Sequence, residues 1–312
     1  MALYTRKTAL FAKIESVSGT PETLVAANTL VIRNVTLTPL DATMVDRSLM
    51  RNYMGNSPQI AVDQKVSLDF EIEIAGAGGA ANAIPKFGPL LLACGMVGAD
   101  LTTSYAYTVI NSGFQTLSLE TFIDGVKHAM YGAMGDVTWD FTVKQIPVMK
   151  FKFLGRYTTP SDASAYTYTP TGWTAPLGVN NTNTPTFSLH TIAQSSAAVQ
   201  ALSISLGNQL DFESLIGNEF VQIVDRKASG SVTLLAHAVA TKNWFTTALA
   251  MTQDALNFVH GTATGNKVQV AAPNAQILKP TYGDMNGLRT LQMGLQFIPT
   301  SSTVGELTFS TL

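Results

Sequence analysis

Residues 65–74 alternate between apolar and polar side chains with a period of two. Five apolar residues occupy the even positions: Val66, Leu68, Phe70, Ile72 and Ile74. The odd positions carry a lysine, a serine and three carboxylates. Alternation of this length requires an extended strand with one face in a core and the other in water. Similar runs recur along the chain, so the expected fold class is all-β, with short helices between some of the strands.

The same order of elements is predicted twice. Residues 116–137 align with residues 256–277 at a constant shift of 140 positions, which places Gly125 on Gly265 and Lys127 on Lys267. An alternating strand and a short apolar stretch precede each segment. A fused pair of similar units often replaces two subunits of a symmetric ring. Two unrelated β-domains are the alternative, because alternating strands resemble one another in any antiparallel sheet.

This reading divides the chain into four parts. We expect an N-terminal arm outside the first core at residues 1–29, a first unit at 30–156, a linker at 157–186 and a second, more divergent unit with a C-terminal tail at 187–312. In the first unit, Pro85 precedes a predicted short helix at 87–94. The dipeptide Asp124-Gly125 predicts a tight hairpin turn. Residues 39–57 are expected to form a long loop.

Composition favours a subunit whose sides are covered by other copies of the chain. Only 13% of the residues are charged, where about 25% is usual for soluble proteins. The net charge of −2 gives no overall basic field that would attract nucleic acid. No signal peptide and no transmembrane segment are expected, so synthesis in a cytoplasm is predicted.

No catalytic, cofactor or metal site is predicted. Cys94 is the single cysteine and lies in an apolar run, which favours a buried structural thiol. The four histidines lack metal-ligand spacing. Glu71 and Glu73 resemble a glycosidase pair only in being two carboxylates on one strand face, which an ordinary wet face also explains. The chain is therefore expected not to be an enzyme.

Several segments carry a family resemblance. These are residues 67–79 and 85–96, the runs at 124–128 and 132–135, and residues 272–277 and 282–288 near the end of the chain. Together they resemble the major tail tube protein of long, non-contractile-tailed bacteriophages. The resemblance implies two tandem tail-tube-type β-sandwich domains, whose strands close into a tube wall on assembly. It also implies rings stacked around a lumen that carries genomic DNA from capsid to host.

The resemblance also implies residue roles and partners. It assigns the strand flanking the long loop to the lumen, and hence Asp69, Glu71 and Glu73 as lumen-lining groups. It assigns the loop to ring stacking, through Arg47, Arg51 and Tyr53 and a counterpart at residues 207–219. Since two units are fused, a ring of three chains with near-six-fold symmetry is expected. The implied partners are the chain itself, a tape measure protein, tail terminator and distal tail proteins and double-stranded DNA in transit without specific binding, with no membrane partner and a location in the virion tail.

Three alternatives stay open at this stage. The carboxylate face of residues 65–74 looks the same if it lies on an outer, solvated surface. The long loop is also compatible with a mobile loop that contacts nothing. A carbohydrate- or receptor-binding β-sandwich, such as an adhesin or tail-tip component, would place aromatic residues in loops, and the candidates are Tyr166, Tyr168 and Trp173.

Overall fold

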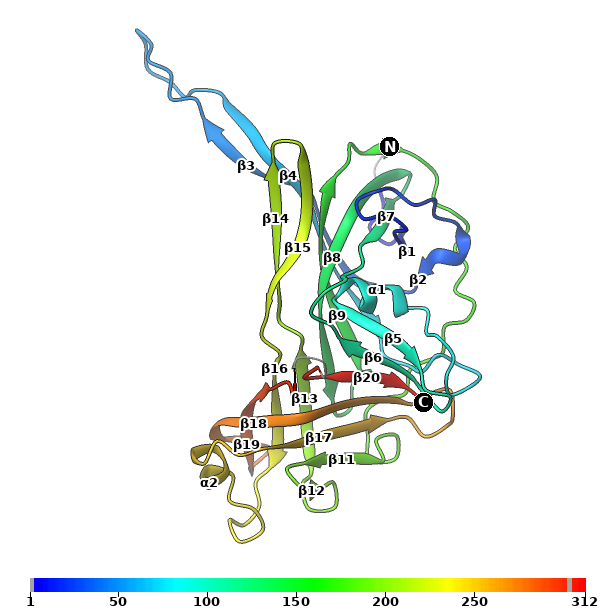
Figure 1. The fold of residues 1–312 in the computed structure, drawn as a ribbon, viewed down its shortest axis with the longest axis vertical. Coiled ribbons are helices and arrows are strands. Elements are labelled where there is room, and N and C mark those ends of the chain that lie inside the picture. The colour runs from blue at the N-terminus through cyan, green and yellow to red at the C-terminus, as the bar shows by residue number, and fades with distance from the viewer. Residues whose placement is uncertain (1–2, 302–304) are drawn as a thin grey trace.

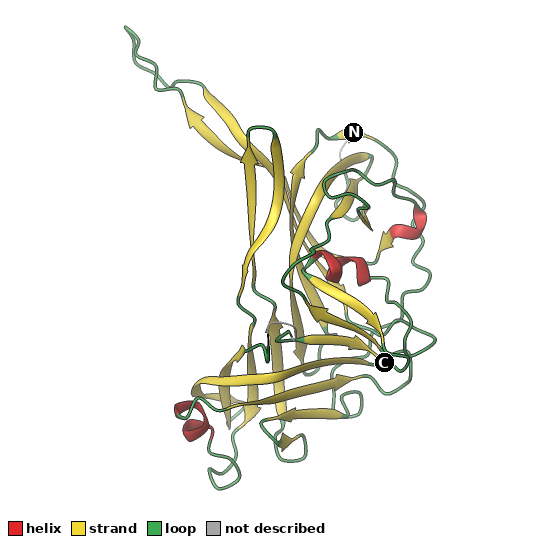
Figure 2. Ribbon diagram, in the orientation of Figure 1, coloured by secondary structure: helices red, strands yellow, loops and turns green. Residues whose placement is uncertain are grey.

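The computed structural model describes residues 3–301 and 305–312. Strands dominate the chain (Figure 2), and its two α-helices, α1 (Gly88–Ala93) and α2 (Trp244–Leu249), have six residues each. The predicted all-β class with short helices is confirmed. No helix among the described residues has the length and apolar character needed to cross a membrane.

The first set of strands, here called the first repeat, is built around the alternating strand β4. Its strands are β1 (Thr8–Ile14), β3 (Arg33–Asp46), β4 (Gln59–Glu73), β7 (Leu117–Ile123), β8 (Val126–Thr142) and β9 (Val148–Tyr157). They pair antiparallel in the spatial order β1-β7-β8-β9-β4-β3. In β4, the apolar side chains predicted to face a core are at most 3% exposed.

The second repeat has the same spatial order. Its strands are β11 (Thr186–Leu189), β13 (Val199–Ser205), β14 (Asn208–Leu215), β15 (Asn218–Arg226), β16 (Ser229–Leu235), β17 (Gln253–His260), β18 (Val268–Met285) and β19 (Leu288–Phe297). Six of them pair in the spatial order β11-β17-β18-β19-β16-β13, and each of these six has a counterpart in the first repeat. Along the chain, the hairpin β14–β15 connects β13 to β16, just as the distal part of β3 and β4 forms a hairpin in the first repeat. The domain boundaries at residues 30–156 and 187–312 stay a prediction.

The two repeats share one sheet and one core. β13 pairs antiparallel with the end of β8, which puts Ile204 opposite Trp139. Both side chains are buried, and the Trp139 ring stacks on Phe309 with 5.7 Å between ring centroids. The resulting sheet contains 18 strands. The join between the repeats is therefore made of backbone hydrogen bonds and core packing together.

Short strands complete the sheet. They are β2 (Thr29–Leu30), β5 (Met96–Asp100), β6 (Tyr105–Val109), β10 (Ser161–Asp162), β12 (Ile192–Ala193) and β20 (Thr308–Thr311), with a 3-10 turn at Ala26–Asn28. β20 pairs with β6 on one side and β18 on the other, so it ties the end of the chain to both repeats. In the linker, Tyr166 packs edge-on against Phe11 and Phe122. A packed linker thus accounts for this tyrosine.

The N-terminal segment corrects one expectation. Residues 8–14 do not lie outside the first core, because β1 pairs with β7 and Leu10 is fully buried. Glu15 fixes the end of this strand: its carboxylate accepts hydrogen bonds from the Ser118 hydroxyl at 2.9 Å and the Gly132 amide at 2.8 Å. A buried carboxylate needs such partners. Sequence analysis missed β1 because its consecutive residues Leu10, Phe11 and Ala12 are all apolar and buried, so the strand shows no period of two.

The expected loops are also partly corrected. β3 continues to Asp46, so only residues 47–58 connect it to β4. Residues 207–219 lie largely in the hairpin β14–β15 rather than in a loop. The predicted turn at Asp124-Gly125 is confirmed, with positive φ angles of 46° and 101°. The predicted helix at 87–94 is confirmed as α1.

The two long hairpins have different surroundings. Figure 1 shows the distal part of β3 and β4 reaching away from the body, whereas β14–β15 stands alongside β8. β14–β15 contacts β8, β9 and β4. Helix α2 lies at the opposite end of the molecule from the hairpin tips (Figure 1). The molecule therefore has two distinct ends along its longest axis.

Candidate functional site

One polar face runs without interruption across both repeats. A single row of paired residues crosses it from β4 to β18. In order, these residues are Glu71, Lys150, Thr138, Ser205, Ser229, Gln296 and Gln276. The side chains of neighbouring residues on these strands point into the core, because side chains alternate along a strand. The sheet thus presents one wide, continuous polar surface on the side away from the core.

The predicted carboxylates Glu71 and Glu73 lie on this face and are neutralised on one side by β3. Arg33 Nε lies 3.4 Å from Glu71 Oε2, and Arg33 Nη1 lies 3.6 Å from Glu73 Oε1. The Asn34 side-chain amide donates to Glu71 Oε2 at 2.7 Å. These groups are partly exposed, so the ion pairs orient the side chains more than they stabilise the fold.

On the other side, β9 brings lysines that sequence reasoning missed. Lys150 lies opposite Glu71, and Lys152 lies opposite Asp69. Lys150 also forms an ion pair with Asp140 at 2.5 Å, and this hydrogen bond raises the pKa of the lysine. The signal was present in the alternation of lysines with Met149, Phe151 and Phe153, but only the strand register shows which carboxylates face them.

Asp69 occupies the border between the open and the covered part of this face. Its Oδ1 is buried and has no hydrogen-bond partner in the structure. Beyond it, β14–β15 covers the sheet: Phe212 and Val221 pack with Met134, and Lys65 Nζ lies 6.0 Å from the centroid of the Phe212 ring. Glu71 and Glu73 therefore belong to the open part of the face, and Asp69 lies at its edge.

In the second repeat the same face carries uncharged side chains. The positions that correspond to Asp69, Glu71 and Glu73 in the shared strand order are Ser229, Ser231 and Thr233 on β16. Gln292 and Gln296 on β19 stand where β9 has Val148 and Lys152. The polar face is thus charged in the first repeat and neutral in the second.

The predicted loop residues lie at the tip of the β3–β4 hairpin. Arg47, Arg51 and Tyr53 are exposed, and the Arg51 guanidinium lies 5.6 Å from the centroid of the Tyr53 ring. Met50 and Met54 on the same tip are completely exposed. Two fully solvated methionines and an exposed tyrosine are a costly arrangement for a free surface and are typical of a binding surface. Sequence reasoning did not single out these methionines.

The residues that the structure describes form no metal centre. No cluster of three or more His, Cys, Asp or Glu side chains is placed to hold a metal ion in residues 3–301 and 305–312. Cys94 is fully buried, and burial raises the pKa of its thiol. A thiol in this state is a weak nucleophile.

The chain matches a known protein family. A family model described as phage tail tube protein matches residues 5–292. No curated protein matches the chain.

Proposed function

The chain belongs to the phage tail tube protein family, and we propose that it is the subunit of a long, non-contractile phage tail. It assembles into rings, the rings stack into a tube, and the lumen conducts genomic DNA from capsid to host. The protein is made in the cytoplasm of the host bacterium and acts in the virion without enzymatic activity. Electron microscopy of the virion tests the tail type, since a contractile tail would show a sheath around the tube.

The continuous polar face is the observation that carries this proposal. The wall of a tube must be covered on its sides by neighbours and be wet on the lumen side. A face that remains polar across both repeats, with the core behind it, has this character. We propose that it lines the lumen, with Glu71 and Glu73 in the open part and Asp69 at its border.

The charge pattern suits a duplex in transit. DNA is a dense polyanion, and each free lysine or arginine on its path would add salt-dependent drag by exchanging counterions at the phosphates. On the polar face, Lys150 is paired with Asp140, and Arg33 lies beside Glu71 and Glu73. Lys150 and Arg33 are thus held by carboxylates, whereas the exposed Lys152 has no ion pair among the described residues. The second repeat contributes mainly hydroxyl and amide groups, with Gly294 and Leu278 in the same rows.

We propose rings of three chains that have near-six-fold appearance. The shared strand order supplies two wall units per chain, so three chains provide the six units of a closed ring. The interface would be heterologous, with the second repeat of one chain meeting the first repeat of the next. The rotational symmetry of a ring in cryo-EM class averages tests this directly. A ring of six chains would overturn it.

The hairpin tip at residues 47–58 is proposed to contact the adjacent ring. Its exposed Arg47, Arg51 and Tyr53 are residue types enriched at interface hot spots. Deleting residues 44–54 should leave a folded chain that forms rings but does not elongate into tubes, as seen by negative-stain microscopy and circular dichroism. A matched control is Ile216→Ser at the tip of β14–β15, where Ile216 is also fully exposed. Normal tubes from the deletion would contradict the assignment.

The remaining partners follow from a tube of this kind. We propose contacts with a tape measure protein inside the growing tube and with terminator and distal tail proteins at its two ends. Double-stranded DNA passes without specific binding. Co-purification of tubes from infected cells, followed by mass spectrometry, tests for these proteins.

A further inference from the structure

The sulfur atoms of the chain differ widely in their access to solvent. Among the methionines that the structure describes, Met50 and Met54 alone are completely exposed, at 101% and 100%. Met251 and Met44 follow at 66% and 52%. The others are buried or half-buried, and they are Met96, Met130, Met134, Met149, Met285 and Met293. The two most accessible thioethers therefore lie close together in sequence on one hairpin tip.

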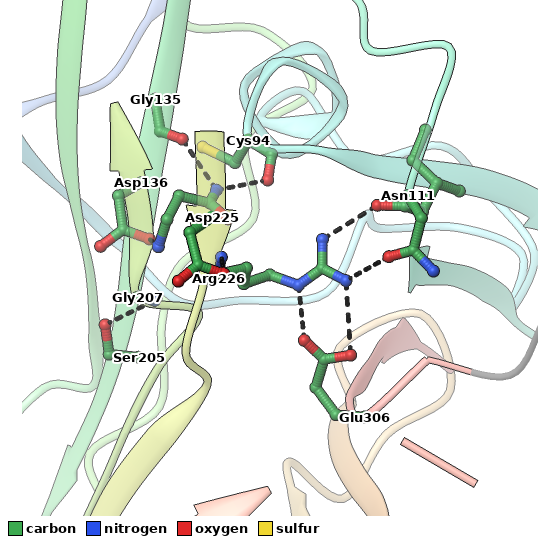
Figure 3. A network of polar contacts seen from close by, with 11 residues as sticks. Cys94, Asn111, Gly135, Asp136, Ser205, Gly207, Asp225, Arg226 and Glu306 are labelled. Atoms are coloured by element: carbon green, nitrogen blue, oxygen red, sulfur yellow. Dashed lines mark hydrogen bonds and ion pairs between the residues drawn. The ribbon is translucent and has the colours of Figure 1, made fainter. Parts of the chain in front are cut away.

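Cys94, the single thiol of the chain, does not compete with them for an oxidant. Its side chain is fully buried, and burial raises the pKa of the thiol, so little of the reactive thiolate is present. The Asn208 side-chain amide donates to the Cys94 carbonyl at 2.7 Å and to the Gly135 carbonyl at 3.0 Å (Figure 3). These bonds tie the end of α1 to β8. The first sulfur to meet a dissolved oxidant is therefore a thioether of the tip.

Local contacts give this tip a defined shape. The Leu49 amide donates to the Ser57 hydroxyl oxygen at 3.2 Å, which links its two sides. The Arg51 guanidinium lies 5.6 Å from the centroid of the Tyr53 ring and donates to the Asn56 carbonyl at 3.5 Å. These contacts use polar groups and an aromatic ring, and they leave both methionines uncovered. The thioethers are thus presented to solvent by an ordered turn of the chain.

A peroxide converts such a thioether to a sulfoxide. A sulfur lone pair attacks one peroxide oxygen, the O–O bond breaks and the other oxygen leaves as water, so sulfur loses two electrons to the peroxide. Methionine sulfoxide reductases reverse the change with a dithiol, which becomes a disulfide while the sulfoxide oxygen leaves as water. The modification is therefore reversible.

Oxidation changes what the tip can contact. A sulfoxide is polar, and burying a polar group without a hydrogen-bond partner costs free energy. Leu49 and Tyr53, which are 43% and 66% exposed, belong to the same surface as the two methionines. Two sulfoxides would therefore replace the most adaptable apolar groups of this surface with groups that need water.

We propose that Met50 and Met54 form a reversible oxidation site, which a peroxide modifies before any other sulfur of the described residues. The oxidised tip does not dock on the adjacent ring, and reduction of the two sulfoxides restores docking. Once a tube has formed, the contact covers both thioethers and makes them resistant to the same oxidant. The inference rests on the proposed role of the tip in ring stacking and adds a chemical control of that step.

Peptide mapping tests the order of oxidation. The unassembled native chain is treated with hydrogen peroxide, quenched at intervals and digested, and mass spectrometry gives the oxidation rate of each methionine. Met50 and Met54 should react at least about tenfold faster than the buried Met149 and Met293, because susceptibility follows exposure. They should also react faster than Met251. If Met251 or a buried methionine reacts first, the inference is wrong.

Tube elongation tests the consequence. After both tip methionines have gained one oxygen, elongation followed by light scattering and negative-stain microscopy should fall at least about tenfold. Sulfoxide reductases of both stereospecificities, supplied with a dithiol, should restore it. Unchanged elongation with both sulfoxides present, or no recovery after their reduction, would overturn the inference and leave the stacking role intact. Normal tubes from the deletion of residues 44–54 would instead overturn the contact itself.

Matched variants locate the effect. Each variant is compared with its own untreated sample, so a change in basal elongation does not enter the ratio. Met50→Leu/Met54→Leu keeps apolar side chains that peroxide does not oxidise, and its loss should be less than about twofold. Met251→Leu keeps both tip thioethers and should lose as much as the native chain. Equal losses in the two variants would place the damage elsewhere and overturn the inference.

The single variants Met50→Leu and Met54→Leu serve if the double variant does not elongate even untreated. Each retains one thioether on the tip, so each should lose less elongation on oxidation than the native chain. Losses as large as that of the native chain in both single variants would contradict the inference.

Finished tubes give a test that needs no variant. In tubes, Met50 and Met54 should oxidise at least about tenfold more slowly than in the unassembled chain, because the contact excludes the oxidant. The buried Met149 and Met293 should react slowly in both states. Equal rates for the tip methionines in tubes and in the unassembled chain would contradict the proposed covering.

Discussion

The two repeats use one strand order for surfaces of different chemistry. In the first repeat, the polar face carries Asp69 and Glu71 opposite two lysines of β9, and Glu73 opposite Val148. In the second, Ser229, Ser231 and Thr233 stand at the same positions. The core-facing residues of β4 and β16 remain apolar in both. The fold therefore constrains the buried face strictly and leaves the polar face free to diverge.

The two short helices differ in how far the rest of the chain buries their side chains. Leu90 and Leu91 of α1 are fully buried beneath strands of the first repeat. In α2, only Trp244 is buried, and Leu249 is 83% exposed. The helix has thus become part of the core in one repeat and a surface element in the other.

The difference in burial between α1 and α2 gives the largest expected effect on stability. Leu91→Ala removes a fully buried side chain and should lower the free energy of unfolding by about 2–5 kcal/mol. Leu249→Ala, the same change at an exposed position of α2, should stay within about 0.5 kcal/mol. Urea unfolding followed by circular dichroism measures both. Equal losses would mean that α2 is covered in the isolated chain.

Acid should give the next largest effect, through the buried histidines. His190 and His260 are buried in the second repeat, and burial lowers the pKa of both. A lowered pKa means that the folded state holds neutral rings, so stability is present above the ordinary pKa of about 6.5 and is lost as pH falls below it. The melting temperature should therefore fall between pH 7.5 and pH 5.

The hydrogen bonds of His260 identify a control for this effect. The Thr184 hydroxyl lies 3.0 Å from Nδ1, and Nε2 lies 2.9 Å from the Leu177 carbonyl. His260→Gln retains polar groups but cannot titrate, so it should reduce the loss of melting temperature in acid. A loss of the same size in this variant would show that other groups cause it.

Charge on the polar face should change DNA passage more than assembly. Replacing Asp69, Glu71 and Glu73 with lysine should leave tubes largely intact and slow genome ejection, most strongly at low salt. Replacing Ser229, Ser231 and Thr233 with lysine adds the same cations with half the charge change. It should slow ejection less. If neither triple variant alters ejection, the face does not line the channel.

The smallest effect is expected at the ion pairs of β3. Arg33 is 42% exposed in its side chain and contacts Glu71 and Glu73 at 3.4 and 3.6 Å. Arg33→Met should change the free energy of unfolding by about 0–1 kcal/mol, because exposed ion pairs contribute little. Chemical denaturation measures this. A loss well above that range would show that the charged face of the first repeat also stabilises its fold.

Local patterns predicted the elements that alternate or turn sharply. The strand around Phe70, the turn at Asp124-Gly125 and the helix containing Leu91 all follow from short-range rules. The hairpin β14–β15 was missed because β15 carries apolar residues on both faces (Phe220, Val221, Ile223 and Val224), so it shows no period of two. The pairing of β13 with β8 was missed for another reason. Contacts between segments more than sixty residues apart leave no trace in local periodicity.

The polar face could be predicted only in part. Three of its carboxylates were visible in the alternation around β4, yet their partners Lys150 and Lys152 depend on the register between β4 and β9. The exposed Met50 and Met54 could have been found in the sequence, since methionines in a polar loop are unusual for a free surface. Their full exposure became clear only from the structure.

The β8–β13 join also affects how an assembly responds to dilution. Because both strands belong to one chain, the linker sets a high effective concentration of each for the other, and dilution cannot separate them. A join between two chains, in contrast, weakens as protein concentration falls. In the proposed ring of three chains, fusing the repeats would therefore halve the number of joins that depend on concentration. It would also lower the number of chains that must associate to close such a ring from six to three.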